Sequence, residues 1–216
     1  MLVSSNSPRT KAHPPQPSGG RKSDATRRRI LDAAAATFRA KGYAGARLSD
    51  IAAAAETQAG SLYYYFDSKD ELLEAVLDIG VTRVFDFVRA AVEALPADAG
   101  WRLKITTAIE SHLAMALHLD TYSSANIRIF GQIPDDIRNR HQVLQRRYGK
   151  FWRDLLEGAA ADGAIRRDLD LSVVRMMLLG SLNWSVEWYK PNGQTAREIG
   201  AQFGQMLFDG LADGTG

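Results

Sequence analysis

Apolar residues recur at spacings of three and four along most of this chain, and that periodicity limits the folds open to it. The segments between Pro96, Pro134 and Pro191 carry this spacing rather than the strict alternation of a half-buried strand. A spacing of three and four places apolar side chains on one face of an α-helix. We therefore predict an all-α protein.

The start of the chain differs from the rest. Four of the seven prolines lie within the first 17 residues, and Ser18-Gly19-Gly20 follows them. Proline and glycine disfavour helix, and the segment has almost no apolar side chain to bury. We expect a disordered, basic and proline-rich arm over residues 1–22.

Helix boundaries are indicated by local signals. Gly42 is a plausible C-cap, and Ser68-Lys69-Asp70-Glu71 is a capping box in which the Ser68 hydroxyl accepts an N–H and Glu71 reaches back. The pattern predicts helices over residues 24–40, 48–55, 59–65, 69 to just before Pro96, 101–119, 141–160, 171–189 and 195–211, with a further short helix at 135–139.

Composition excludes several kinds of chemistry. The chain has no cysteine, and its four histidines form no H-E-x-x-H motif. It contains neither a G-x-S-x-G elbow nor a P-loop. We expect no catalytic residues, no metal and no cofactor. The longest apolar candidate, residues 174–189, is broken by Arg175 and Glu187, and the first 20 residues lack a secretory signal, so we expect a cytoplasmic protein without membrane contact.

Charge is unevenly distributed. Residues 1–66 hold ten Lys and Arg against four acidic residues, although the net charge of the whole chain is only +2. A basic end on a mildly acidic body is typical of a surface that meets a polyanion, and a basic tail alone would also produce part of this asymmetry.

The basic part has the layout of a helix-turn-helix unit: helix, short helix, tight turn and short helix within about 45 residues. The residues themselves are more specific than this layout. Three segments resemble the TetR family of bacterial transcriptional regulators: I-L-D-A-A-A-A-T-F-R-A-K-G-Y from Ile30, D-I-A-A-A-A from Asp50 and G-S-L-Y-Y-Y-F-D-S-K-D-E-L-L from Gly60. The resemblance implies a three-helix DNA-binding domain, here residues 23–70, and a helical ligand-binding and dimerisation domain, residues 71–216. It also implies a homodimeric repressor of an inverted-repeat operator in double-stranded DNA, released by a small molecule.

Candidate DNA contacts follow from the matched positions and from side-chain chemistry. Small residues at the start of the last short helix let its backbone approach base edges, tyrosine hydroxyls reach phosphates, and basic side chains neutralise them. The candidates are Arg27, Arg28, Arg47, Ser49, Thr57, Gln58, Ala59, Gly60, Ser61, Tyr63, Tyr64, Tyr65 and Lys69.

The turn departs from the family pattern. Glu56-Thr57-Gln58 stands where the family usually has Gly-Val-Ser, so we expect a non-glycine residue in a left-handed conformation, at a cost of roughly 1–2 kcal/mol. Arg47 replaces the usual Ser or Thr cap, and Thr57 is expected to cap the last short helix because Gln58 caps poorly. The alternative to a DNA-binding regulator is a ligand-binding or scaffolding protein of the same fold with little operator specificity.

Two C-terminal helices are candidates for a dimer interface. The helix at 171–189 is apolar on two faces, and the last helix carries Ala196, Gly200 and Gly204 as a strip that permits close helix approach. The expected interface residues are Met177, Ser181, Trp184, Ala196, Gly200, Phe203, Gly204, Leu207 and Leu211. Packing within one subunit is the alternative.

Aromatic and polar residues between the helix that begins at residue 69 and the candidate dimer helices suit a pocket for a largely apolar effector. They suit a plain apolar core equally well. The candidates are Phe87, His112, Met115, Tyr122, Arg128, Phe130, Phe151, Trp152, Trp184 and Trp188. The Asn183-Trp184 and Trp188-Tyr189-Lys190-Pro191 pattern resembles a branch of the family in which some members respond to acyl-coenzyme A. An acyl-CoA or another hydrophobic molecule is the expected effector, with arginines at 128, 138, 140, 146, 147 and 153 as expected phosphate partners.

Overall fold

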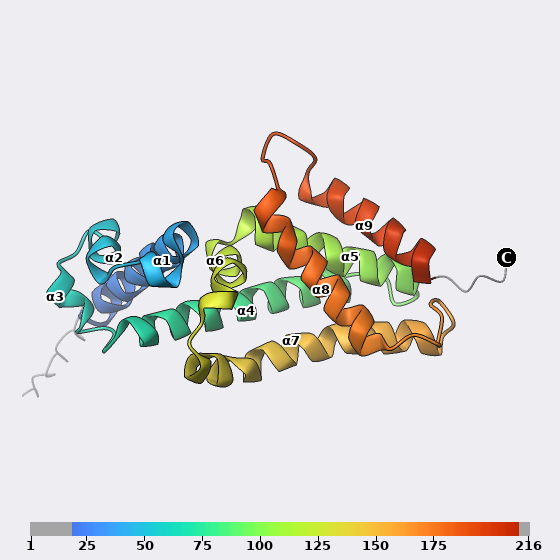
Figure 1. Ribbon diagram of the computed structural model, residues 1–216, viewed down its shortest axis with the longest axis horizontal. Helices are drawn as coiled ribbons and strands as arrows, with labels where there is room; N and C mark the ends of the chain where they lie inside the picture. The colour runs from blue at the N-terminus through green and yellow to red at the C-terminus, as the bar shows by residue number, and fades with distance from the viewer. Residues whose placement is uncertain (1–18, 212–216) are drawn as a thin grey trace, which may run out of the picture.

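The computed structural model describes residues 19–211, and within this range the regular elements are all helical, which confirms the all-α prediction. The helices are α1 (Gly19–Gly45), α2 (Leu48–Ala54), α3 (Ala59–Leu62), α4 (Lys69–Glu93), α5 (Trp101–Ala114), the π-helical turn η1 (Met115–Leu119), α6 (Thr121–Ile129), the 3-10 turn η2 (Phe130–Gln132), α7 (Asp135–Ala161), α8 (Leu171–Trp188) and α9 (Ala196–Leu211) (Figure 1). None of these helices is long and apolar enough to cross a membrane.

The Ser68 cap predicted at the start of α4 forms, and Glu71 reaches back to the residue before Ser68. The Glu71 N–H donates to the Ser68 hydroxyl at 3.1 Å, and the Glu71 carboxylate accepts from the Asp67 N–H at 2.6 Å. Two backbone donors that would otherwise lack partners are thereby satisfied. From this start α4 runs 25 residues and connects the two ends of the elongated molecule (Figure 1).

Several predicted boundaries were wrong. Helix α1 begins at Gly19 and so takes in the end of the arm expected over residues 1–22; residues 1–18 lie outside the described part. The left-handed conformation predicted at Gly42 is confirmed, with a φ of +69° at a kink, and a further short stretch of helix follows to Gly45. Helix α3 ends at Leu62 rather than at residue 65, α7 is a single helix from Asp135, and α6 was not predicted at all. Asp120 caps α6 by accepting from the Ser123 N–H at 2.8 Å.

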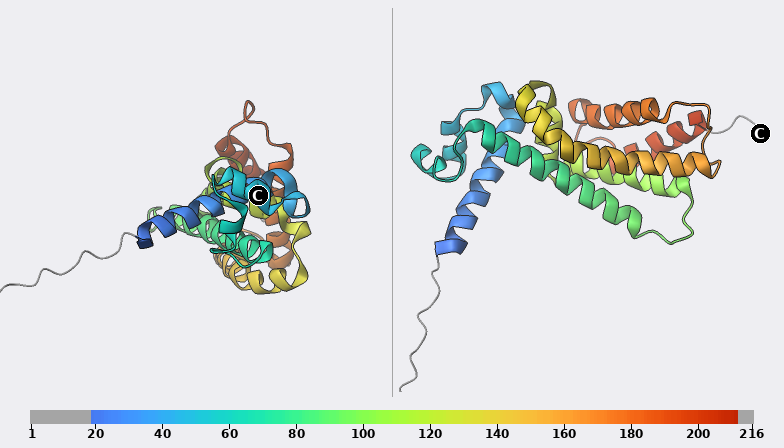
Figure 2. Two further views of the ribbon diagram at one scale, coloured as in Figure 1. Left: turned by 90° about the vertical axis from the view of Figure 1, so that its left-hand side faces the viewer. Right: turned by 90° about the horizontal axis from the view of Figure 1, so that it is seen from below.

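Two apolar cores lie along α4. The first joins α1, α2, α3 and the early turns of α4, and α6 contributes Tyr122, Ala125 and Ile129 to it. The second joins the later turns of α4 to α5, α7, α8 and α9. Figure 1 shows α6 between the two ends, and Figure 2 shows α4 and α7 running alongside one another. Helix α6 therefore belongs to the first core although it lies in the expected C-terminal domain.

Candidate DNA-binding face and effector cavity

The short helix α3 and the turn after it present an exposed face. Tyr63 and Tyr64 are 59% and 81% exposed, while Leu62 and Phe66 are buried in the first core. A Cβ added at Gly60 would meet nothing within 4 Å, so the backbone there is open to an approaching partner. Hydroxyls and an open backbone on one face suit contact with phosphates and base edges.

The other predicted DNA-contacting residues lie around this face. Arg27, Arg28, Arg47, Ser49, Gln58 and Ala59 are exposed, and Thr57, Ser61, Tyr65 and Lys69 are partly buried. Lys69 lies over the Tyr43 ring, with its Nζ 4.2 Å from the ring centroid, so this cation is already held in position at the start of α4.

Backbone conformation at the turn agrees with its sequence. Glu56 has a φ of +51°, which confirms the predicted left-handed conformation of a non-glycine residue at this turn. No other non-glycine residue among the described ones has a positive φ. The expectation that Thr57 caps α3 was wrong, since Gln58 occupies the N-cap position without a side-chain hydrogen bond. Arg47 likewise caps α2 without a bond from its side chain to the helix, and the Asp50 carboxylate accepts from the Arg47 N–H at 3.4 Å instead.

A cavity of about 460 Å³ lies in the C-terminal part of the molecule. Its volume falls within the range of small-molecule sites. Its walls come from α4, α5, η1, α6, η2, α7 and α8, and the lining residues are Gly80, Val81, Val84, His112, Ala116, Ser123, Asn126, Ile127, Phe130, Gln145, Tyr148, Gly149, Arg175, Met176, Leu179, Gly180 and Asn183. Apolar walls with a few fixed polar groups are typical of a site for a largely apolar ligand.

His112 is the best-fixed polar group of the lining. Its Nε2 lies 3.1 Å from Asn183 Oδ1 and its Nδ1 lies 2.9 Å from the Tyr148 hydroxyl. Burial lowers the pKa of His112 to about 4, so the ring is neutral near pH 7. Since Asn183 Oδ1 only accepts, Nε2 carries the proton and Nδ1 accepts from Tyr148, whose pKa is raised by burial. The cavity thus holds a neutral imidazole of one tautomer.

Only two of the ten predicted effector contacts, His112 and Phe130, line the cavity. Met115, Phe151 and Trp152 pack in the second core, which confirms the alternative of a plain core for them. Tyr122 lies in the first core, and Arg128 is exposed, with its guanidinium 4.0 Å from Glu187. Phe87, Trp184 and Trp188 are exposed and are not among the lining residues. These eight residues do not line this cavity, because the sequence does not distinguish a lining residue from a core residue.

Sequence reasoning missed most polar groups of the cavity. Asn126, Gln145, Asn183 and Arg175 each lie on a different turn of α6, α7 or α8. One available signal was the presence of Arg175 and Asn183 in the mostly apolar helix α8, because a separation of about two helical turns places both near one face.

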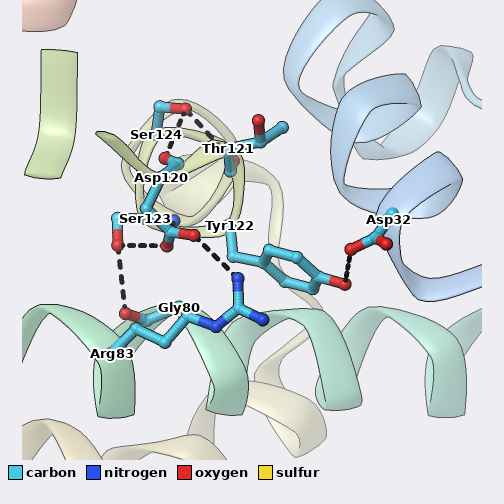
Figure 3. A network of polar contacts seen from close by, with 8 residues as sticks. All are labelled: Asp32, Gly80, Arg83, Asp120, Thr121, Tyr122, Ser123 and Ser124. Carbon is cyan, nitrogen blue, oxygen red and sulfur yellow. Dashed lines mark hydrogen bonds and ion pairs between the residues drawn. The ribbon is translucent and has the colours of Figure 1, made fainter. Parts of the chain in front are cut away.

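A polar network joins the cavity wall to the DNA-binding end (Figure 3). Ser123, a lining residue, donates to Asp120 at 2.7 Å, and Asp120 pairs with Arg83 at 2.9 Å. The Arg83 guanidinium lies 4.3 Å from the centroid of the Tyr122 ring, and the Tyr122 hydroxyl donates to Asp32 of α1 at 2.6 Å. Consecutive contacts therefore run from the cavity to the first helix of the DNA-binding end.

Helices α4 and α6 touch closely where this network begins. A Cβ added at Gly80 would lie 2.7 Å from the Tyr122 carbonyl oxygen, so only glycine permits this approach. At this wall of the cavity the two helices therefore pack backbone against backbone.

The predicted dimer residues fall into two groups. Met177, Ser181 and Trp184 are exposed on α8, in line with Val173 and Trp188. On α9, however, a Cβ at Gly200 would lie 2.8 Å from Glu110, and one at Gly204 would lie 2.7 Å from Thr106, both on α5 of the same chain.

The small-residue strip is therefore occupied within the subunit. Ala196 is buried, Phe203 and Leu207 pack against the second core, and the side chain of Leu211 lies outside the described ones. These α9 residues therefore make contacts within the subunit, and their part in a dimer interface stays a prediction.

Comparison with known proteins places the sequence among regulators. Residues 30–76 match the family described as bacterial regulatory proteins, tetR family, and residues 98–211 match the tetracyclin repressor-like C-terminal domain. The HTH-type transcriptional repressor KstR2 of Rhodococcus jostii (strain RHA1) is 30% identical over 194 residues, which cover 86% of this chain and 91% of that protein.

Solved structures share the fold. The ketosteroid transcriptional regulator KstR2 of Mycobacterium tuberculosis superposes with a TM-score of 0.72 at 24% identity, covering 87% of this chain and 95% of that one. AibR in complex with isovaleryl coenzyme A and operator DNA superposes with a TM-score of 0.74 at 22% identity, covering 86% and 97%.

Proposed function

Because the chain belongs to the TetR family of bacterial transcriptional regulators, we propose that it is a homodimeric repressor of an inverted-repeat operator, controlled by an effector in the α4–α8 cavity. The observation that carries the proposal is the contact path from that cavity to Asp32 of α1 (Figure 3). A ligand on this wall acts on the elements that position α3.

Operator contact is assigned to the face formed by α3, the tyrosines after it and the surrounding basic side chains. Tyr63 and Tyr64 supply hydroxyls, the open backbone at Gly60 approaches base edges, and Lys69 meets a phosphate. The Glu56 turn places a negative charge beside this face, which weakens its attraction for phosphates. The basic side chains around the face still neutralise phosphates, so we expect operator affinity to fall as the salt concentration rises.

Dimerisation is assigned to the exposed apolar stripe of α8. Met177 and Trp184 are 68% and 66% exposed, and Val173 and Trp188 extend the same stripe. Apolar side chains in a row on one helix are typical of an association surface. Two subunits then present two copies of α3, and half-sites one helical turn of DNA apart combine their binding energies.

Release of DNA follows from differential affinity. An effector that fills the cavity displaces α6 against α4 at Gly80, and the Tyr122–Asp32 contact carries that displacement to α1. An effector that favours the non-binding state by about 1–3 kcal/mol lowers operator affinity about 5- to 150-fold, and DNA lowers effector affinity by the same factor.

The effector class we propose is an acyl-CoA or a similar hydrophobic molecule. The apolar walls formed by Val81, Val84, Ala116 and Leu179 suit an acyl chain, and AibR, a protein of the same fold, binds isovaleryl coenzyme A. Acyl-CoAs of increasing chain length are titrated against intrinsic tryptophan fluorescence, to which Trp152 contributes with its ring 6.4 Å from that of His112 at the cavity.

The expected result is saturable quenching together with release of a labelled operator duplex. Thermal stability should rise over the same concentration range. Binding that leaves operator affinity unchanged contradicts control by effector, and no response at any chain length contradicts the effector class.

A further inference from the structure

Arg175 is the one charged side chain among the described residues that line the cavity. It lies on α8, and its Nε is fully buried without a hydrogen-bond partner. Between residues 19 and 211 no carboxylate lies within ion-pair distance of its guanidinium. Arg175 as a whole is only partly buried, so its guanidinium lies at the cavity wall as a cation without a protein counter-charge.

The opposite helix is shaped to hold this guanidinium. A Cβ added at Gly149, in the interior of the 27-residue helix α7, would lie 2.7 Å from Arg175 Nη1. Glycine in a helix interior is unfavourable, and here it supplies the space in which the guanidinium lies. Gln145 and Asn183 line the same cavity, so the charged group has neutral hydrogen-bonding neighbours.

The arginines expected at phosphate groups lie elsewhere. Arg138 pairs with Asp135 at 3.1 Å, and Arg140 pairs with Glu74 at 2.8 Å. Arg128 and Arg146 contact Glu187 and Gln142, Arg147 lies over the Phe85 ring, and Arg153 is exposed. None of these six lines the cavity, which leaves Arg175 as the cation that a ligand there would meet.

We propose that Arg175 binds an anionic oxygen of the effector, supplied by a carboxylate or by a phosphate, while the apolar part of the effector lies along Val81, Val84 and Leu179. The proposal rests on the proposed function, since it takes the α4–α8 cavity as the effector site. A planar guanidinium donates parallel hydrogen bonds to two oxygens of either group, and such charge-assisted bonds are strong. The cavity therefore selects anionic over neutral molecules of the same apolar body.

The test compares three forms of each chain: the free acid, the CoA thioester and the neutral methyl ester. Isovaleryl, octanoyl and palmitoyl chains are titrated calorimetrically into the wild type and into Arg175→Met, with Arg153→Met as the control for loss of an exposed arginine. At least one anionic form should bind the wild type tenfold or more tightly than the ester of the same chain. Arg175→Met should abolish that preference, and Arg153→Met should keep it.

The two anionic arms identify the source of the oxygen. Preference for the free acid indicates a carboxylate at Arg175, and preference for the thioester indicates a phosphate. Gly149→Ala keeps the charge but displaces the guanidinium, so it should weaken binding of the anion severalfold more than binding of the ester.

Three outcomes overturn the proposal: the ester binds as tightly as both anions, the preference survives Arg175→Met, or no anionic form binds. Operator binding by apo Arg175→Met separates these from failure of the proposed function. The variant should bind operator like the wild type, because Arg175 lies away from α3; if neither protein binds any operator, the proposed function itself fails.

Discussion

The Tyr122 hydroxyl of α6 donates a 2.6 Å hydrogen bond to the Asp32 carboxylate of α1. Burial and this carboxylate raise the pKa of Tyr122, so the phenol remains a donor throughout the physiological range. Among the described residues, α1 also meets this part of the chain where the Tyr43 N–H donates to Gln132 at 3.0 Å. The Tyr122–Asp32 pair thus links the two ends of the proposed switch.

Replacing Tyr122 with Phe removes this bond and keeps the ring under Arg83. We expect a loss of about 1 kcal/mol in the free energy of unfolding, because Asp32 is exposed and regains water. We also expect a smaller effector-induced change in operator affinity. Urea unfolding and operator titrations with and without effector measure the two effects. Unchanged coupling would contradict a role for this contact in signalling.

Glu56 offers a test of strain at the turn. Glu56→Gly removes the cost of a left-handed non-glycine residue, roughly 1–2 kcal/mol, and adds about 0.5–1 kcal/mol of unfolded-state entropy. The net gain in the free energy of unfolding is about 0–1.5 kcal/mol, centred on about 0.7 kcal/mol. Glu56→Gln keeps the strain and removes only the charge. Both variants should bind DNA more tightly at low salt, and only the glycine variant should be more stable to thermal unfolding. Equal stability of the two would contradict backbone strain at this turn.

A charged side chain placed in the exposed apolar stripe of α8 tests whether this stripe is the dimer interface. Trp184→Glu should yield a monomer in light scattering and weaken operator binding by more than about tenfold, since half-site energies no longer combine. Val143→Glu, on the exposed surface of α7, is the control and should remain dimeric. A dimeric Trp184→Glu protein would place the interface elsewhere.

His112 predicts a pH dependence of stability. Its pKa falls from 6.5 in the unfolded chain to about 4 in the folded one, chiefly through burial, so the unfolded state binds more protons between these values. The folded state should lose about 1.4 kcal/mol per pH unit as pH falls from 6.5 to 4, and nothing from this group above 6.5. His112→Gln should remove that part of the slope in urea unfolding at pH 4–7. An identical slope in the variant would contradict a neutral buried imidazole.

Features that depend on neighbouring residues were predicted well from sequence. Ser68 and Glu71 form their capping interactions, and Glu56 takes a positive φ, because the causes of both lie within a few residues. Helix α6 was missed because few of its residues are strongly apolar; the Asp120 cap and burial between α1 and α4 stabilise it instead.

Features that depend on distant packing were not predictable. Gly200 and Gly204 do allow close helix contact, yet the helix they contact is α5 of the same chain. His112 and Trp152 were indistinguishable as pocket candidates, and only the packing of α5 against α7 and α8 leaves one at the cavity and the other in the core. Arg175 interrupts an apolar segment. In the sequence this excludes a membrane span, but it does not show that the side chain lies at a cavity.

The central claim is sequence-specific DNA binding, and enrichment of genomic fragments on the purified protein at near-physiological salt tests it most directly. Tyr64→Ala is the matched control, since its side chain is 81% exposed on the proposed DNA face. We predict recovery of one or a few fragments that share an inverted repeat with half-site centres about 10 base pairs apart or a multiple of that, with weaker recovery by the variant. Weak, salt-sensitive binding without sequence preference, equal in both proteins, would contradict the account and favour a ligand-binding protein of the same fold.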